Sequence, residues 1–143
     1  MKPLFEILLK IAGYDIAKAI KELVQIQVLS ALDFNKWQVE QKWKIARHHY
    51  DNNISYRNKI GNQFPHEWTD LPIMKKSDYQ EDLEKLLSKG YTKKNTYISN
   101  TSGSSGHPFY FAKNKSCHAR TWAIHKQRFS ELGLSFSSLE ARF

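Results

Sequence analysis

Apolar residues recur at helical spacing through the first third of the chain. The clearest stripe consists of Ile16, Ile20, Leu23 and Val24. Gly13 separates this predicted helix from a shorter one over residues 4–12. A further helix is predicted for DFNKWQVEQKWKIARHHYDNN, where the repeating positions are Val39, Trp43, Ala46 and Tyr50. Charged residues occupy the other faces, so we interpret these aromatic side chains as core packing.

The middle of the chain predicts an irregular connection followed by a short helix. Residues 61–72 contain Pro65 and Pro72 and predict an irregular connection. The segment KKSDYQEDLEKLLSKG then predicts a short helix over about residues 78–88. Ser77 is suited to its N-cap, with Gln80 at the capping-box position, and Gly90 to its end. Lys75, Lys76 and Asp78 are interpreted as the start of this helix rather than as catalytic groups.

Beyond this segment the pattern favours strands. Residues 96–98 and the segment PFYFAKN predict two strands on either side of a loop. A last helix is predicted with Ser116 as its cap and Gly133 after its end, and one of its faces carries Ala119, Trp122, Phe129 and Leu132. The predicted fold class is α/β, with a helical lead-in over residues 1–60 and the start of a domain over residues 61–143. Two strands do not complete such a domain, so we expect a truncated chain.

Charge and composition narrow the possible partners. The chain of 143 residues has a formal net charge of +8 and a pI of about 9.5, which suits anionic partners. Its basic residues are dispersed, so we do not expect a nucleic-acid interface. A single cysteine, Cys117, excludes an internal disulfide and indicates a reducing compartment. The apolar run at residues 4–9 is too short to span a bilayer and does not resemble a signal peptide, so we expect a cytoplasmic protein.

The loop between the predicted strands is unusually rich in small and hydroxyl side chains. Its members are Thr101, Ser102, Gly103, Ser104, Ser105 and Gly106. Two glycines three positions apart allow backbone N–H groups to converge on an anion, and the hydroxyls add further donors. Walker A and Rossmann motifs are excluded, because His107 and Pro108 follow the second glycine and lead into a strand. A phosphate-binding loop is predicted, and a flexible linker is the alternative.

A metal site is the other chemistry that we considered. Cys117, His118 and His125 lie on the last predicted helix. One face of that helix offers at most two of these ligands, so we expect no metal site there.

The segment TSGSSGHPFYF resembles the phosphate loop of the adenylate-forming enzymes, the superfamily of acyl-CoA synthetases, nonribosomal adenylation domains and luciferases. Their pattern is roughly [ST]-[SG]-G-[ST]-[ST]-G-x-P, with lysine common at x. The upstream pair Tyr56-Arg57 and the segment LPIMKKSD are similar to the phenylacetate–CoA ligase-like branch, which includes the CapK proteins of capsular polysaccharide clusters. The resemblance extends from about Phe34 onward.

The resemblance implies an activity and a set of ligands. The residues of the loop, 101–106, would embrace the β- and γ-phosphates of ATP, and Pro108 would fix the exit into the next strand. Such enzymes use ATP and Mg²⁺ to convert a carboxylic acid to an acyl-adenylate, and many transfer the acyl group to coenzyme A. His107 stands where the family commonly has lysine, which leaves less positive charge near neutral pH.

The resemblance also implies what this chain lacks. The family's acyl pocket, acidic Mg²⁺ motif, ribose-binding aspartate and late lysine all lie downstream, so we expect the chain alone to be inactive. One alternative is a non-catalytic basic module that binds a phosphate or nucleotide. Another is a peripheral membrane protein that uses residues 4–28. The sequence identifies neither the acid nor the acceptor, and it does not determine the oligomeric state.

Overall fold

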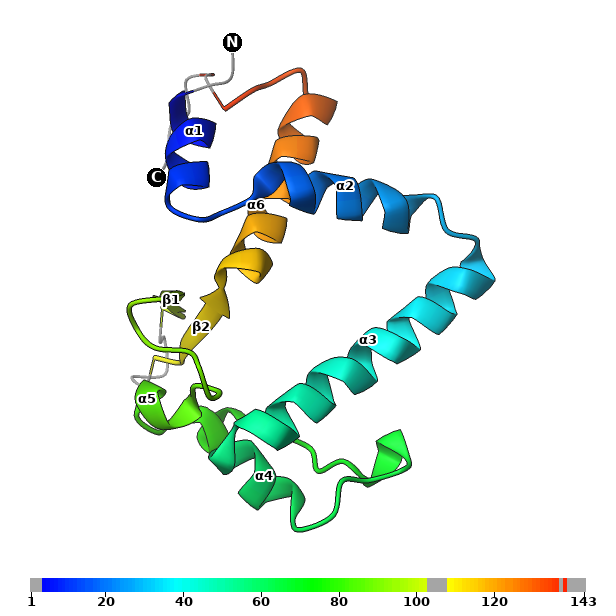
Figure 1. Cartoon of the computed structure of the whole chain (residues 1–143), viewed down its shortest axis with the longest axis vertical. Coiled ribbons are helices and arrows are strands. Elements are labelled where there is room, and N and C mark those ends of the chain that lie inside the picture. The colour runs from blue at the N-terminus through cyan, green and yellow to red at the C-terminus, as the bar shows by residue number, and fades with distance from the viewer. Residues whose placement is uncertain (1–3, 103–107, 137, 139–143) are drawn as a thin grey trace. The chain divides into compact units, whose positions relative to one another are not determined.

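The computed structural model describes residues 4–102, 108–136 and 138 of the chain (Figure 1). These residues form two compact units. Unit 1 combines Met1–Ser30 with Lys113–Phe143, and unit 2 is the continuous segment Ala31–Ala112. Helices predominate, and the strands described form one two-stranded antiparallel sheet. The predicted mixture of helix and strand is thus confirmed at this coarse level.

Unit 1 is built from the helices α1 (Leu4–Ile11), α2 (Ile16–Gln27) and α6 (Lys115–Glu131). Figure 1 shows α2 crossing α6. The core between them consists of Ile16, Ala19, Ala119 and Ala123.

 This core is therefore one isoleucine with three alanines, whose small side chains let the two helices approach closely.

The ends of these helices follow local capping chemistry. Asp15 caps α2, where its carboxylate accepts a hydrogen bond from the Lys18 N–H at 3.0 Å. Gly13, between α1 and α2, has a φ of +88°, which confirms its predicted role as the separator. The prediction that Ser116 caps α6 is wrong. Asn114 caps this helix instead, because its side-chain oxygen accepts a hydrogen bond from the Cys117 N–H at 2.8 Å.

The predicted buried face of α6 is correct only in part. Ala119 is buried, and Trp122 packs against the core of unit 1. Phe129 lies in an aromatic contact with Phe136, with ring centroids 5.8 Å apart. Leu132, however, is 74% exposed, because α6 ends at the residue before it and the chain turns away there.

Unit 2 begins with the long helix α3 (Ala31–Asn52), followed by α4 (Ile54–Ile60). Trp43 of α3 lies edge-on to Trp68 at a centroid distance of 5.3 Å and also contacts Phe64. Tyr50 contacts the same Phe64, so the interpretation of Trp43 and Tyr50 as packing residues is confirmed. Val39, which was predicted to share their face, is 47% exposed.

The single helix predicted over residues 78–88 is wrong. The segment forms a 3₁₀ turn, η2 (Lys76–Tyr79), and a separate one-turn helix, α5 (Leu83–Leu86). Asp82 begins α5 by accepting a hydrogen bond from the Glu84 N–H, so the chain restarts there instead of continuing the first turn. A further 3₁₀ turn, η1 (Trp68–Asp70), lies within the connection predicted to be irregular.

The two predicted strands are confirmed as β1 (Thr96–Asn100) and β2 (Tyr110–Asn114). They pair with each other and form a hairpin around the loop. β2 leads directly into α6, since Asn114 is both its last residue and the cap of that helix. Among the described residues, no helix is both long enough and apolar enough to cross a bilayer.

Candidate functional site

The hairpin loop is closed by a pair of hydrogen bonds between Thr101 and Phe109. The Thr101 N–H donates to the Phe109 carbonyl at 3.0 Å. In return, the Phe109 N–H donates to the Thr101 hydroxyl oxygen at 3.1 Å. Because the oxygen serves here as an acceptor, its own hydrogen can be donated to a ligand. The predicted arrangement of strand, loop and strand is therefore present, and two hydrogen bonds join the residues at the ends of the loop.

The structure describes the two ends of the predicted phosphate loop. Thr101 and Ser102 are described, and both are exposed. Pro108 is described as well and is half-buried beside Phe109. The remaining predicted site residues, Gly103, Ser104, Ser105, Gly106 and His107, lie outside the described residues.

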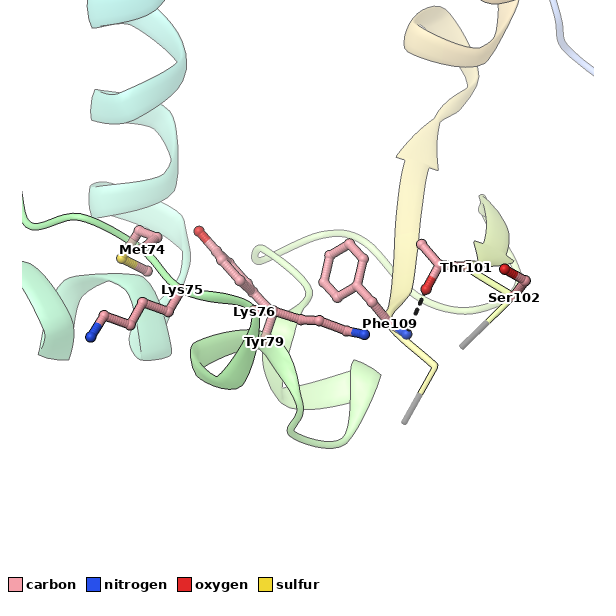
Figure 2. A pocket seen from close by; sticks show the side chains of 7 residues that line it. All are labelled: Met74, Lys75, Lys76, Tyr79, Thr101, Ser102 and Phe109. Carbon is pink, nitrogen blue, oxygen red and sulfur yellow. Dashed lines mark hydrogen bonds between the residues drawn. The ribbon is translucent and has the colours of Figure 1, made fainter. Parts of the chain in front are cut away.

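An open pocket of about 480 Å³ lies beside Thr101 and Phe109, the hydrogen-bonded ends of the loop (Figure 2). Three segments of unit 2 form it: one within residues 74–79, residues 101–102 at the start of the loop, and Phe109 after it. Its lining residues are Met74, Lys75, Lys76, Tyr79, Thr101, Ser102 and Phe109. The pocket thus combines ammonium groups, hydroxyls and apolar surface, which suits an anion attached to an apolar group.

The two lysines of the pocket differ in direction. In Figure 2 the Lys76 side chain extends toward Phe109, whereas the Lys75 side chain extends away from it. Lys76 is therefore the better placed of the two to face a ligand held by Thr101.

Asp78 holds the lysine-bearing segment in place. One oxygen of its carboxylate accepts a hydrogen bond from the Lys75 N–H at 2.7 Å. The other lies 2.6 Å from the Lys59 ammonium of α4. The hydrogen bond from Lys59, followed by that from the Lys75 N–H, lowers the pKa of Asp78. The carboxylate is thus ionised and engaged within the fold, which confirms its interpretation as a residue that begins a helical turn.

Aromatic contacts form one wall of the pocket. Tyr79 and Phe109 meet edge to face with ring centroids 5.8 Å apart. Phe109 also stacks on Phe111 of β2, at 5.9 Å. Burial raises the pKa of Tyr79, with smaller contributions from Tyr56 and Asp78. The Tyr79 phenol therefore stays protonated at neutral pH and keeps its capacity to donate a hydrogen bond.

The pocket fits a phosphate better than a metal ion. None of the described residues that line it carries a carboxylate, whereas Mg²⁺ is usually bound through one or two carboxylates. In the part of the chain that the structure describes, no three His, Cys, Asp or Glu side chains are grouped so that they could hold a metal. The lysines and hydroxyls of the pocket can instead meet the oxygens of a phosphate group.

The structure adds residues that the loop motif did not contain. Lys76, Tyr79 and Met74 join Thr101 and Ser102 at one pocket. The available signal was the segment LPIMKKSD, which entered the analysis through its resemblance to one family branch. Nothing in its pattern along the chain predicts contact with the loop, because that contact depends on the tertiary fold.

Comparison with known proteins finds no matching family model, no matching curated protein and no matching solved structure for this chain. The resemblance to the adenylate-forming enzymes therefore rests on the residues of the chain itself. The function that follows is accordingly argued from those residues and from the pocket.

Proposed function

We propose that the chain is the N-terminal part of an ATP-dependent ligase that activates a carboxylic acid as its acyl-adenylate. The proposed type is that of the phenylacetate–CoA ligases and CapK proteins, a superfamily in which many members transfer the acyl group to coenzyme A. Its fold would then be the start of the adenylate-forming large domain. The CapK resemblance suggests a role in capsular polysaccharide biosynthesis, and the use of ATP and coenzyme A suggests the cytoplasm.

The observation that carries this proposal is the pocket where the ends of the loop meet Lys76. Thr101 is held by its backbone and side-chain bonds to Phe109, so its hydroxyl needs little reordering to meet an anion. Lys76 would supply an ammonium group to a bound anion, where the family commonly has lysine at the position of His107. Together with the hydroxyls, this charge would stabilise negative charge on a bound polyphosphate.

The residues at hand account for binding and orientation. Thr101, Ser102 and Lys76 would hold phosphate oxygens, and the Tyr79–Phe109 wall would shield one side of the pocket from water. Bound ATP would supply the phosphoryl group with which the carboxylic acid is activated. Mg²⁺ would need ligands other than the residues that line this pocket.

Calorimetry with ATP, pyrophosphate and AMP tests the binding step on this chain. We expect ATP and pyrophosphate to bind and AMP to bind far more weakly, since the loop would contact the β- and γ-phosphates. Lys76→Ala should weaken ATP binding about tenfold, because a charge-assisted hydrogen bond is lost at a partly exposed site. Lys94→Ala is the matched control, since Lys94 is an exposed lysine of unit 2 outside the pocket. Equal effects of the two substitutions would refute the assignment of Lys76.

ATP–pyrophosphate exchange in a longer protein that contains this chain tests the reaction. We expect exchange with at least one member of a panel of aryl and fatty acids. No exchange with any acid, together with no ATP binding, would exclude the ligase.

A non-catalytic phosphate-binding module is the second candidate. The observation that favours it is that the described residues lining the pocket offer lysines and hydroxyls for an anion but no carboxylate for a metal ion. ATP binding without exchange would support this alternative.

A further inference from the structure

One side of α1 carries a stripe of large apolar side chains that are exposed within the part of the chain that the structure describes. Its members are Leu4, Ile7, Leu8 and Ile11, at the spacing i, i+3, i+4 and i+7. Their exposed fractions are 72%, 44%, 55% and 78%. These four residues, named here the α1 stripe, form a continuous row along one side of the helix.

Contacts on the opposite side hold α1 with this stripe facing outward. Phe5 meets the Trp122 ring edge to face at a centroid distance of 5.0 Å. Leu9 packs against the core of unit 1. The Glu6 carboxylate, which is only 14% exposed, lies 2.6 Å from the Lys126 ammonium. The helix therefore cannot turn its stripe inward without breaking an aromatic contact and a shielded ion pair.

The charge of unit 1 indicates what covers the stripe. Its described residues carry eight Lys and Arg side chains against four Asp and Glu side chains. Each of the four acidic groups is already engaged within the unit: Glu6, Glu22 and Glu131 form ion pairs, and Asp15 caps α2. Lys10, next to the stripe on α1, is exposed. Unit 1 thus has four more basic than acidic side chains among its described residues, and Lys10 places one ammonium group beside the stripe.

We infer that the α1 stripe docks onto an anionic lipid bilayer. A short helix with an apolar outer face lies in the plane of the interface, where acyl chains would meet the stripe and acidic headgroups would meet Lys10 and the net positive charge of unit 1. A second copy of the chain fits this surface less well, because two copies of unit 1, each with a net positive charge, would repel each other. This inference does not depend on the proposed nucleotide site, which belongs to unit 2.

Vesicle sedimentation with the 143-residue chain tests the inference. We expect the chain to pellet with phosphatidylcholine vesicles containing about 30% phosphatidylglycerol but not with phosphatidylcholine alone. About 0.5 M NaCl should release it, since salt screens the headgroup attraction. Failure to pellet with the anionic vesicles, or equal binding to both kinds, would overturn the inference.

Substitutions on the stripe identify the docking surface. Leu8→Asn and Ile11→Asn should each reduce partitioning about tenfold, because each removes an apolar group from the acyl boundary. Ile73→Asn is the matched control, since Ile73 is 86% exposed but belongs to unit 2, and it should leave binding unchanged. Far-UV circular dichroism should show that all three variants stay folded. If the stripe variants bind vesicles like wild type, or if they instead abolish a dimer seen by sedimentation equilibrium, the bilayer is not the partner.

Discussion

Asn53 joins two parts of unit 2 through both ends of its side-chain amide. Its oxygen accepts a hydrogen bond from the Tyr56 N–H at 2.8 Å, which caps α4. Its nitrogen donates to the Leu86 carbonyl at the end of α5, at 2.6 Å. The residue is 5% exposed, so water cannot readily replace either partner. We therefore predict that Asn53→Ala strongly destabilises unit 2.

The expected magnitude follows from the two bonds. Loss of an N-cap costs about 1 kcal/mol. Leaving the partly buried Leu86 carbonyl without its donor costs about 1–2 kcal/mol. Asn53→Ala should therefore lower the free energy of unfolding by roughly 2–3 kcal/mol. Asn53→Ser retains a capping oxygen but lacks the amide donor, so it should cost only about 1–2 kcal/mol.

Urea unfolding followed by tryptophan fluorescence measures the two losses. Hydrogen exchange provides a local readout, because the Tyr56 amide should lose protection in Asn53→Ala and retain it in Asn53→Ser. A loss below about 1 kcal/mol for the alanine variant would refute the reasoning. Equal losses for both variants, with equal Tyr56 exchange, would show that the cap contributes nothing.

Two further predictions concern pH and core packing. Burial, with a smaller effect of His48, lowers the pKa of His49, whose ring lies 3.0 Å from the Ser88 hydroxyl. The folded chain therefore binds a proton at His49 less readily than the unfolded chain, so the urea midpoint should decrease as the pH is lowered from about 7 to about 5. His49→Asn should weaken this pH dependence, and an unchanged dependence of the midpoint on pH would contradict the prediction. Ala123 is 1% exposed, so Ala123→Leu should cost about 1–3 kcal/mol through overpacking. Thermal unfolding should show the loss, whereas Ala17→Leu at an exposed position of α2 should cost under about 0.5 kcal/mol, and equal effects would contradict the packing of α2 on α6.

Helix positions in this chain could be predicted because their signals are local. The apolar period identified α2 and α3, and Gly13 marked the end of α1. The glycines at positions 13 and 133 have the positive φ angles, +88° and +69°, that suit a turn after a helix. The segment over residues 78–88 shows the limit of such signals. Ser77 predicted one continuous helix, but the Asp78 carboxylate binds Lys59 of α4 and Asp82 begins a separate turn. A partner brought in by the tertiary fold overrode the local pattern.

The candidate site likewise contains residues that the sequence could predict and residues that only the tertiary fold brings in. Thr101 and Ser102 could be predicted because hydroxyls and glycines clustered in one loop are themselves a chemical signal. Lys76 and Tyr79 could not, since their place at the pocket follows from the contact between the Tyr79 and Phe109 rings. Such an edge-to-face contact joins segments that are remote in the sequence, and no periodicity records it.

The division of unit 1 between two stretches of sequence has a consequence for synthesis. Arg120 of α6 and Glu22 of α2, which form an ion pair, are 98 positions apart in the chain. All of Ala31–Ala112 must be translated between the two parts of unit 1, which takes on the order of 4–16 s at bacterial and eukaryotic rates. Unit 2 can fold during this time, because it is continuous. The nascent α1 and α2 therefore emerge from the ribosome well before α6, and until it arrives Ile16 and Ala19 lack the helix that completes their core.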